Sequence, residues 1–516
     1  MSMKVLLATA PWSFADVSPA HLADNRGWLG WLAGIGKRTV KGVSPPMGLL
    51  YLASSLRQAG HVPVLGDGSE LALGEMLDLI ERERPDVVGL SVMTPMWPRT
   101  QAFARAIKDR FDVPIIVGGP FPTAWREKCL AECDAIDYAV SGEGELILLE
   151  LLEAMQGYRP IGEVKGVAWR DGNVPVQNAK ASVPKDLDAL PFPARDMVDF
   201  RRYIPTLVRY KRLPTTQMFG TRGCPFGCKF CWVNPIYRQR SIDNIAAEVE
   251  ELIGRWGVRD ITFFDDDSTI RLDHTEAMAD MFLSRGFDIT WAINARVDGG
   301  LTPPLLKKMR RAGLWRILFG IESGVQQSLD SMRKRTKLDE TKHAVKITRE
   351  AGVAAYGTFI FGTPGETFAD GLATIEFARS IGLEFASFTA LTPFPGTAFF
   401  DQIDKSRFYD WSQFTGDKPS FVPDAMSPAE LKTLMALAYK RFYFRPSYIL
   451  RRAMSCTSLE EIRRNIAGFE GMRKIVDGPE DLLAAYAAPE RAGNQGCGTL
   501  PPDALPPRAS PLADAS

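Results

Sequence analysis

The sequence predicts an α/β protein in which a doubly wound parallel sheet comes first, a partial α/β barrel second and a helical region last. Two observations support this prediction. Short apolar stretches alternate with amphipathic stretches over residues 1–150, and they do so again over residues 213–401. The chain also has 516 residues, which is too long for one ordinary hydrophobic core, so two or three packed units are expected.

The first predicted unit, residues 1–150, contains five strand-like stretches with helix-like stretches between them. Parallel strands joined by helices form a Rossmann or flavodoxin-like sheet, which binds ligands beyond the carboxyl ends of its strands. The strands are expected at 4–10, 62–67, 86–92, 113–119 and 137–142, and helices at 47–60, 74–84 and 99–111.

Residues 151–212 are predicted to connect the two series. Here the hydrophobic periodicity weakens and prolines recur. A hairpin is expected over residues 169–176, because Asp171 and Gly172 are typical turn residues between two short apolar stretches.

The second series, residues 213–401, predicts a partial (β/α)6 barrel of the TIM type. Barrels of parallel strands carry their chemistry at the carboxyl ends of the strands. Strands are expected at 215–223, 261–266, 289–295, 315–323, 354–362 and 384–391, with helices near 243–256, 273–285, 302–313, 338–351 and 367–381. The charged segment 333–337 is expected to be a solvated helix end.

The last part of the chain is predicted to be a helical subdomain over residues 402–491, followed by a disordered tail. Its clearest helix begins at Ser427 and is interrupted at Pro446. Residues 492–516 are rich in proline, alanine and serine, a composition that does not form a packed core.

Composition restricts the partners and the location of the protein. The 62 basic and 62 acidic side chains balance, so no net charge favours nucleic acid. No leader pattern and no run of about 18 apolar residues is found, which predicts a cytoplasmic protein without a membrane span. Three of the seven cysteines lie within eight positions, which indicates a metal site rather than a disulfide framework.

The clustered cysteines are Cys224, Cys228 and Cys231, in a C-x3-C-x2-C arrangement directly after the first strand of the second series. Iron–sulfur clusters usually take four cysteines, so three thiolates leave one iron of a cubane open to bind another molecule. A structural zinc site, or cysteines without a metal, is the alternative. Zinc sites prefer two separated cysteine pairs or paired histidines.

This loop resembles the signature of the radical S-adenosylmethionine (SAM) superfamily, and the resemblance extends over roughly residues 215–400. It implies a [4Fe-4S] cluster on the three cysteines and SAM at its open iron. Acidic side chains after the second strand would suit the amino group of SAM, and Arg296 its carboxylate. The SAM contacts implied by the strand-end motifs are Asp265, Asp266, Asn294, Arg296, Glu322, Ser323, Gly362, Pro364, Gly365 and Glu366.

Each of these motifs also has an ordinary explanation. Acidic residues cap helices or strand ends, and Gly-Pro-Gly stretches form turns before helices. The order of the motifs and their repeated position at strand ends favour the SAM interpretation.

The first unit resembles the cobalamin-binding domain that precedes radical SAM barrels in a subclass of methylases and anaerobic cyclases. The D-x-H-x-x-G motif of many corrinoid proteins is absent, so cobalt would have no histidine below it. The alternative is a domain that binds another nucleotide or serves as a scaffold. The resemblance implies cobalamin contacts at Ser91, Thr94, Gly118, Gly119, Gly142 and Glu143.

The combined resemblance implies an enzyme that cleaves SAM reductively and methylates an unactivated carbon of a biosynthetic intermediate. Its partners would be a small-molecule substrate and an external electron donor such as flavodoxin or ferredoxin. An oxidative cyclase, or another cobalamin-dependent enzyme that forms a ring or inserts oxygen, is the alternative. A non-catalytic cobalamin or iron–sulfur sensor is the second alternative.

Overall fold

The computed structural model describes residues 1–12, 43–206, 208–404, 410–454, 462 and 465. Residues Met1–Gly478 form one compact unit, and Pro479–Ser516 form a second unit that lies outside the described residues. The predicted disordered tail, 492–516, therefore lies outside the described residues as well.

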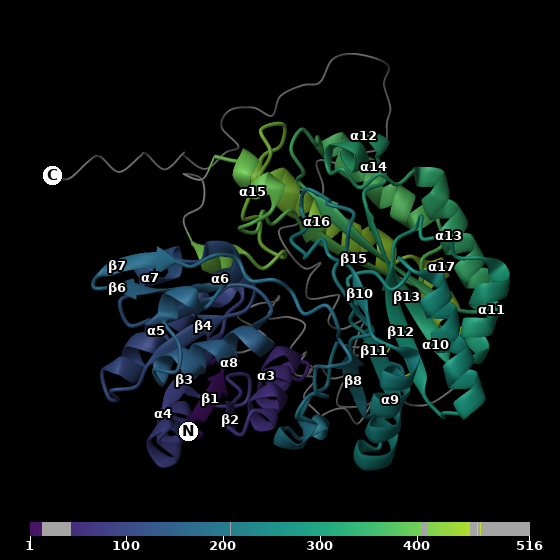
Figure 1. Cartoon of the computed structure of the whole chain (residues 1–516). Helices are drawn as coiled ribbons and strands as arrows, with labels where there is room; N and C mark the ends of the chain where they lie inside the picture. Colours follow the sequence, from purple (N-terminus) through teal and green to yellow (C-terminus); the bar gives the residue numbers. More distant parts are fainter. Residues whose placement is uncertain (13–42, 207, 405–409, 455–461, 463–464, 466–516) are drawn as a thin grey trace. The chain divides into compact units, whose positions relative to one another are not determined.

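The first sheet has seven strands in the order β2-β1-β3-β4-β5-β6-β7 (Figure 1). The first five strands are parallel, and their order reverses between β1 and β3, as in flavodoxin-like sheets. The prediction of a doubly wound sheet is confirmed. The strands are β1 (Lys4–Ala8), β2 (Val62–Gly66), β3 (Val87–Ser91), β4 (Ile115–Gly118), β5 (Tyr138–Val140), β6 (Val167–Asp171) and β7 (Val174–Gln177).

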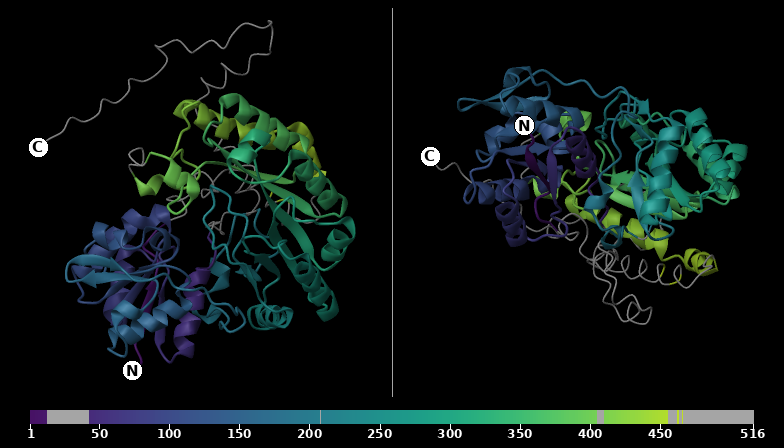
Figure 2. Two further views of the ribbon diagram at one scale, coloured as in Figure 1. Left: turned by 45° about the horizontal axis from the view of Figure 1, so that its top comes forward. Right: turned by 60° about the horizontal axis from the view of Figure 1, so that its bottom comes forward.

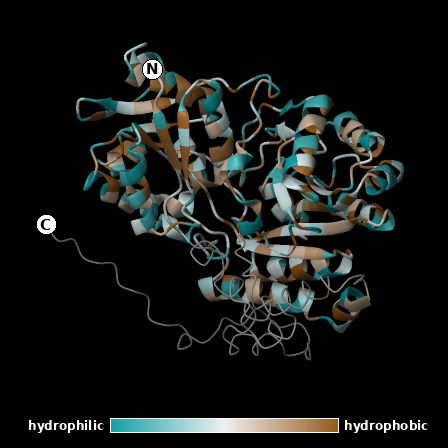
Figure 3. Cartoon of the chain, turned by 90° about the horizontal axis from the view of Figure 1, so that it is seen from below, coloured by the Kyte–Doolittle hydropathy of each residue, from teal (hydrophilic) through white to brown (hydrophobic). Residues whose placement is uncertain are grey.

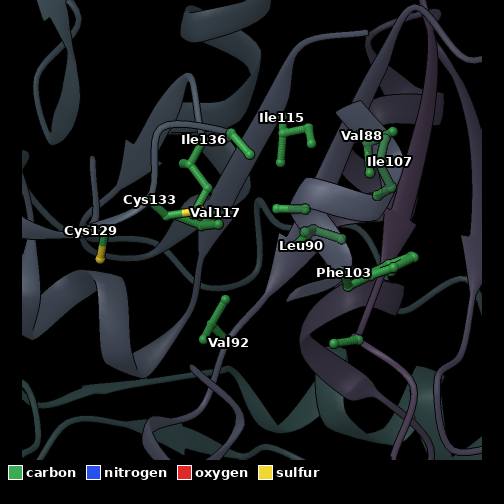
Figure 4. Close-up of a cluster of buried hydrophobic side chains, with 14 of the residues drawn as sticks. Val88, Leu90, Val92, Phe103, Ile107, Ile115, Val117, Cys129, Cys133 and Ile136 are labelled. Carbon is green, nitrogen blue, oxygen red and sulfur yellow. The ribbon is translucent and has the colours of Figure 1, made fainter. Parts of the chain in front are cut away.

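Alternation along the strands explains why this sheet is covered on both faces. Leu6 and Ala8 of β1 point into one apolar cluster, and Val5 and Leu7 point into the other. Figure 4 shows part of the first cluster, in which Val88 of β3 lies beside the helical Ile107. The helices are α3 (Met47–Gln58), α4 (Leu73–Glu83), α5 (Trp97–Lys108), α6 (Pro120–Trp125), α7 (Lys128–Glu132) and α8 (Gly144–Met155).

Strands β6 and β7 form the hairpin that the sequence predicts, with antiparallel pairs from Ala168–Gln177 to Asp171–Val174. The hairpin continues the first sheet, because β6 pairs antiparallel with β5. The boundary placed at residue 150 stays a prediction.

The second sheet has six parallel strands in the order β15-β14-β13-β12-β11-β8 and forms a half-barrel (Figure 2). This confirms the partial barrel. The strands are β8 (Thr215–Met218), β11 (Asp260–Phe263), β12 (Thr290–Ala295), β13 (Leu314–Glu322), β14 (Ala354–Phe361) and β15 (Phe385–Ala390). The helices are α9 (Ile242–Trp256), α10 (Leu272–Arg285), α11 (Pro303–Arg311), α12 (Gln326–Ser331), α13 (Leu338–Glu350) and α14 (Phe368–Ser380).

Local sequence signals set the ends of these helices. Ser241 begins α9, where its hydroxyl accepts a hydrogen bond from the Asn244 amide, and Gly257 ends it in a left-handed conformation. The sequence did not reveal the two short antiparallel strands β9 (Thr221–Arg222) and β10 (Arg238–Gln239). Coloured by hydropathy, the strands are mostly hydrophobic, whereas the outer helices carry hydrophilic residues (Figure 3).

After β15 the structure describes the helices α15 (Ala398–Gln402), α16 (Pro428–Tyr443) and α17 (Pro446–Met454). A capping box of Ser427 and Glu430 precedes α16, which confirms the helix start predicted at Ser427. The predicted interruption at Pro446 is also confirmed, because α16 ends at Tyr443 and α17 begins at Pro446. The hydroxyls of Tyr439 and Tyr443 bond to the backbone N–H and C=O groups of Phe388 and Ala386 at the outer edge of β15. Helix α16 therefore occupies the edge of the second sheet.

The structure also contains short 3-10 helices. They are η2 (Thr94–Met96), η3 (Ile161–Glu163), η4 (Arg195–Met197), η5 (Phe200–Arg202) and η7 (Trp411–Gln413). Within the part of the chain that the structure describes, no helix is both long and apolar enough to cross a membrane.

Candidate active site

The three cysteines lie on one loop that the strands β9 and β10 close. Gly223 has φ 91°, and a Cβ atom at this position would lie 2.1 Å from the Ile236 carbonyl oxygen. The Cys224 amide then donates to the Asn234 carbonyl at 2.9 Å. The loop can close only because position 223 is a glycine.

The thiols of this loop are free of disulfides, and Cys224 and Cys228 are half-buried whereas Cys231 is exposed. Loss of hydration within the loop, neighbouring thiols and Asp266 raise the pKa of Cys231 to about 12, and burial also raises the pKa of Cys224. The protein alone therefore does not stabilise Cys224 and Cys231 as thiolates. Bound iron would supply the missing positive charge.

Among the described residues, no three His, Cys, Asp or Glu side chains converge closely enough to hold one metal ion. This spacing does not favour the zinc alternative, because the ligands of a structural zinc ion all meet at one point. Cubane ligands each bind a different iron, so three thiols spread over one loop fit such a cluster.

Two cationic side chains flank the cysteine loop, each beside an aromatic ring of the loop. The Arg296 guanidinium lies 4.0 Å from the centre of the Phe226 ring, and its Nη1 lies 3.8 Å from Cys228 Sγ. Lys334 Nζ lies 5.8 Å from the centre of the Phe230 ring. These cations would offset part of the negative charge of thiolates in the loop.

Lys334 forms a buried ion pair with Glu322, with 2.8 Å between Nζ and Oε1. Burial alone would lower the pKa of Lys334, but the Glu322 carboxylate and Cys228 together hold the pKa above its usual value. The expectation that segment 333–337 is a solvated helix end is wrong for Lys334, which is 6% exposed. The sequence shows the charge of this lysine but not its distant partner.

Gly320 gives this ion pair its space. A Cβ atom at Gly320 would lie 2.6 Å from Glu322 Oε1 and 2.8 Å from Lys334 Nζ. Glu322 itself has φ 69°, which is uncommon for a residue with a side chain, so the backbone turns sharply at the end of β13. The pair therefore lies directly over the inner face of the strand.

The predicted SAM contacts after β11 and β12 also brace the cysteine loop. The buried Asp265 carboxylate accepts hydrogen bonds from the Gly220 and Thr221 amides at 2.8 and 3.1 Å, and burial raises its pKa to about 6. Asp266 accepts from the Gly223 amide at 2.9 Å, and Asn294 donates to the Asp265 carbonyl at 2.9 Å. Their contacts with SAM stay predictions.

Arg296 is less available for a carboxylate than its sequence position suggests. Its Nε and Nη2 atoms each lie 2.9 Å from a carboxylate oxygen of Asp298, and Nη2 also donates to the Lys334 carbonyl. Only Nη1 faces the cysteine loop. The assignment of Arg296 to the SAM carboxylate stays a prediction, and Asp298 is a competing partner.

The remaining predicted SAM residues lie at the ends of β13 and β14. Ser323 Oγ is 3.1 Å from Thr374 Oγ1, which ties β13 to α14. Glu366 Oε2 accepts from the backbone and side chain of Thr363, and burial raises the pKa of Glu366 to about 7. Between them Gly362, Pro364 and Gly365 form the turn, both glycines having positive φ.

A cavity of about 310 Å³ lies at the carboxyl ends of β1, β3, β4 and β5 and next to β9. The edge between β1 and β3, where the strand order reverses, is the usual ligand site of such a sheet. Predicted cobalamin contacts that line the cavity are Ser91, Gly118, Gly119, Gly142 and Glu143. Thr94 is buried in η2 and is not one of the described lining residues.

The lining of this cavity fits the tail of cobalamin better than it fits a corrin held by histidine. Gly119 has φ 101°, and a Cβ atom there would lie 3.2 Å from the backbone N and O atoms of Val92, so the floor stays open. None of the described residues that line the cavity is a histidine. The described lining residues therefore offer no imidazole to cobalt at this place.

Four charged residues join this cavity to the cysteine loop. Arg222 lies 2.9 Å from Glu143 and 2.7 Å from Glu145, and Arg238 lies 2.5 Å from Glu143. Burial alone would raise the pKa of Glu143, but the two arginines hold it below its usual range. Arg222 and Arg238 form the bridge between β9 and β10, so the bridge that closes the loop is also bonded to the first sheet.

Two family models match these two parts of the chain. The model of the B12 binding domain matches residues 35–152, and the model of the radical SAM superfamily matches residues 218–378. Most residues that line the cavity lie in the first range, and the cysteine loop lies in the second. The chain is a B12-binding radical SAM enzyme. Its cofactors are a [4Fe-4S] cluster, SAM and cobalamin, as in other enzymes of this kind.

Two kinds of curated relatives match this B12-binding radical SAM enzyme. An uncharacterized methyltransferase of Pyrococcus horikoshii is 28% identical over 424 residues, which covers 80% of this chain and 91% of the relative. The anaerobic magnesium-protoporphyrin IX monomethyl ester cyclase of Rubrivivax gelatinosus is 28% identical over 430 residues, covering 80% of this chain and 76% of the cyclase.

Solved structures show the same fold. TsrM from Kitasatospora setae, a radical SAM methyltransferase, superposes with a TM-score of 0.66 at 17% identity, over 92% of this chain and 99% of TsrM. The enzyme also resembles the cobalamin-dependent OxsB, with a TM-score of 0.60 at 16% identity over 73% of this chain, and spans about half (52%) of OxsB.

Proposed function

We propose that this enzyme methylates an unactivated carbon atom of a small-molecule intermediate. The observation that carries the proposal is the ionic bridge from Glu143, beside the cavity of the first sheet, to Arg222 and Arg238, beside the cysteine loop. In this proposal the bridge would hold the two cofactor sites against each other. A methyl donor and a site that activates the substrate would then face the same space.

The residues of this chain would hold and shield the cofactors. Cys224, Cys228 and Cys231 would hold the cluster, while Asp265 and Asp266 orient their loop through backbone amides. When bound, the cluster supplies an electron for cleavage of SAM and cobalamin carries the methyl group. Phe219 and Phe264 line the cavity on the side of the second sheet and would exclude water from it.

The electron needed for this chemistry has to come from outside the chain. We propose flavodoxin or ferredoxin as the donor and the cytoplasm as the location.

The curated methyltransferase relative supports the reaction class, because the match covers nearly all of that protein.

The test is the fate of the SAM methyl group. The anaerobically reconstituted enzyme, with cobalamin, a reductant and SAM with a deuterated methyl group, is incubated with small-molecule extract of its source. We expect a product that carries the deuterated methyl group, and 5'-deoxyadenosine that Cys228→Ala abolishes. Deoxyadenosine together with an unlabelled product would contradict methylation.

An oxidative cyclase is the second candidate, and the similarity to the Rubrivivax cyclase favours it. A cyclase would give an unlabelled product with a new ring or a new oxygen atom in the same experiment. Failure to cleave SAM under strong reduction would contradict both candidate reactions.

A further inference from the structure

A second cavity, of about 480 Å³, lies at the opposite end of the half-barrel from the cysteine loop. Thr290, Ala354 and Phe385, the first residues of β12, β14 and β15, line it. The cysteine loop follows the carboxyl end of β8, and the strands are parallel, so the two sites are at opposite edges of the sheet. The second cavity is therefore not part of the cofactor site.

Positive charge dominates the lining of this cavity. Four cationic side chains come from four segments, Lys211, Arg310 of α11, Arg349 of α13 and Arg452 of α17. Glu384 is the one carboxylate among the described lining residues, and it pairs with Arg452 at 3.3 Å. Neither Arg310 nor Arg349 forms an ion pair with any residue that the structure describes.

The two arginines are held in place by backbone groups. Arg310 Nε donates to the Gly352 carbonyl at 3.0 Å. Arg349 lies against Gly382, where a Cβ atom would be 2.3 Å from its Nη1. Both guanidinium groups are thus positioned without a carboxylate partner.

The cavity wall also contains an unsatisfied buried donor. The indole Nε1 of Trp315 is buried and has no hydrogen-bond partner among the described residues, and the side chain is 8% exposed. A buried N–H group without an acceptor is destabilising, because it has lost its hydrogen bond to water and gained none in the protein. An anion in the cavity could supply the missing acceptor oxygen.

The position of the arginines has a simpler partial explanation. Arg310 and Arg349 lie in the last turns of α11 and α13, where cations offset the partial negative charge of a helix end. This explanation does not extend to Lys211, which belongs to no helix, or to the unpaired indole of Trp315 in β13. A bound anion accounts for all of these features together.

We propose that this cavity binds a small polyanion, the diphosphate group of a phosphorylated small molecule. Diphosphate carries several negative charges and acceptor oxygens, which match guanidinium groups from separate helices and one indole N–H. Binding would tie α11, α13 and the start of β13 together at the end of the barrel that is remote from the cofactors.

The probe is inorganic pyrophosphate, titrated into the anaerobic holoenzyme by calorimetry at low salt. We expect saturable binding at one site, weakened at least about tenfold by Arg349→Glu, because a charged hydrogen bond becomes a repulsion. Lys346→Glu, an equal charge change at an exposed position of α13 outside the cavity, should leave binding unchanged within about twofold.

A second variant tests the indole without a change of charge. Trp315→Phe keeps an aromatic ring but removes the N–H donor. We expect this variant to bind pyrophosphate at least about threefold more weakly than the wild type does. Circular dichroism checks that each variant is folded. Absence of saturable binding to the wild type, unchanged affinity in Arg349→Glu, or an equal loss in Lys346→Glu would each overturn the proposal.

Discussion

The buried ion pair of Lys334 and Glu322, with 2.8 Å between their charged atoms, lies beside the cysteine loop. Both side chains are only 7% exposed, and the Lys334 carbonyl accepts a hydrogen bond from Arg296, whose guanidinium reaches Cys228. The pair therefore connects the end of β13 to the surroundings of the cysteine loop through Arg296, although Arg296 and Cys228 are far from the pair in sequence.

Lys334→Met should destabilise the fold and make the cluster harder to reduce. The substitution leaves the Glu322 carboxylate buried without a partner, which typically costs roughly 3–5 kcal/mol. It also removes a positive charge near the loop, so the midpoint potential of the cluster should fall. Anaerobic denaturant unfolding and an electron-paramagnetic-resonance redox titration measure the two effects. Lys337→Met, at an exposed position, is the control, and an unchanged potential in Lys334→Met would contradict the electrostatic role.

Gly223→Ala should abolish cluster assembly while the protein still folds. The added Cβ would meet the Ile236 carbonyl at 2.1 Å, so the loop could not close. Gly227→Ala is a matched control in the same loop, because φ there is also positive, at 66°, but no atom lies within 4 Å of the added Cβ. Iron and sulfide per chain, measured after reconstitution, should be near zero in the first variant and close to wild type in the second. Equal iron content in both would show that loop closure is not required.

Glu366→Gln should flatten the pH dependence of stability. The folded-state pKa of Glu366 is about 7, above its ordinary value of 4.5, so the folded protein keeps a proton that the unfolded chain releases. This contribution is fully present below pH 4.5 and is lost as the pH rises to about 7, by up to about 3 kcal/mol. Unfolding free energies at several pH values between these limits test the slope. The control is Glu350→Gln at an exposed position. If Glu366→Gln and the wild type show the same slope of unfolding free energy against pH, the raised pKa of Glu366 is refuted.

Glu143→Gln should weaken cobalamin retention and loosen the cysteine loop. The amide cannot neutralise Arg222 and Arg238, so two guanidinium groups would remain half-buried without their shared carboxylate. We expect cobalamin affinity to fall roughly tenfold, since the lost interaction is of the order of a charged hydrogen bond. Bound cobalt and iron are measured together after reconstitution. The exposed Glu153→Gln should retain both metals, and retention of both by Glu143→Gln would argue against coupling of the two sites.

Much of the fold could be predicted from the sequence because its strands are apolar and some helix boundaries have recognisable residues. Ser427 precedes α16 as expected, and the expected interruption at Pro446 is the point at which α17 begins. Strands β9 and β10 could not be predicted, because each has two residues and no alternation to detect. Their pairing depends on a loop closed by Gly223.

The candidate site was harder to predict than the fold. The cysteine spacing identified the loop, but Arg222, Arg238 and Lys334 have no local signal that separates them from surface cations. Their roles depend on partners such as Glu143 and Glu322 that only the tertiary fold brings near. Conversely, Asp265 was predicted from its position, but its hydrogen bonds to loop amides could not be seen in sequence.

The two tyrosines of α16 cover the edge strand of the half-barrel. At the edge of β15, each hydroxyl acts as both donor and acceptor, which is the pattern that a neighbouring strand would otherwise provide. A seventh strand, whether from this chain or from another copy, would have to displace the helix before it could pair. Side chains of α16 thus satisfy backbone groups at the edge of β15 that would otherwise be open to pairing with another strand.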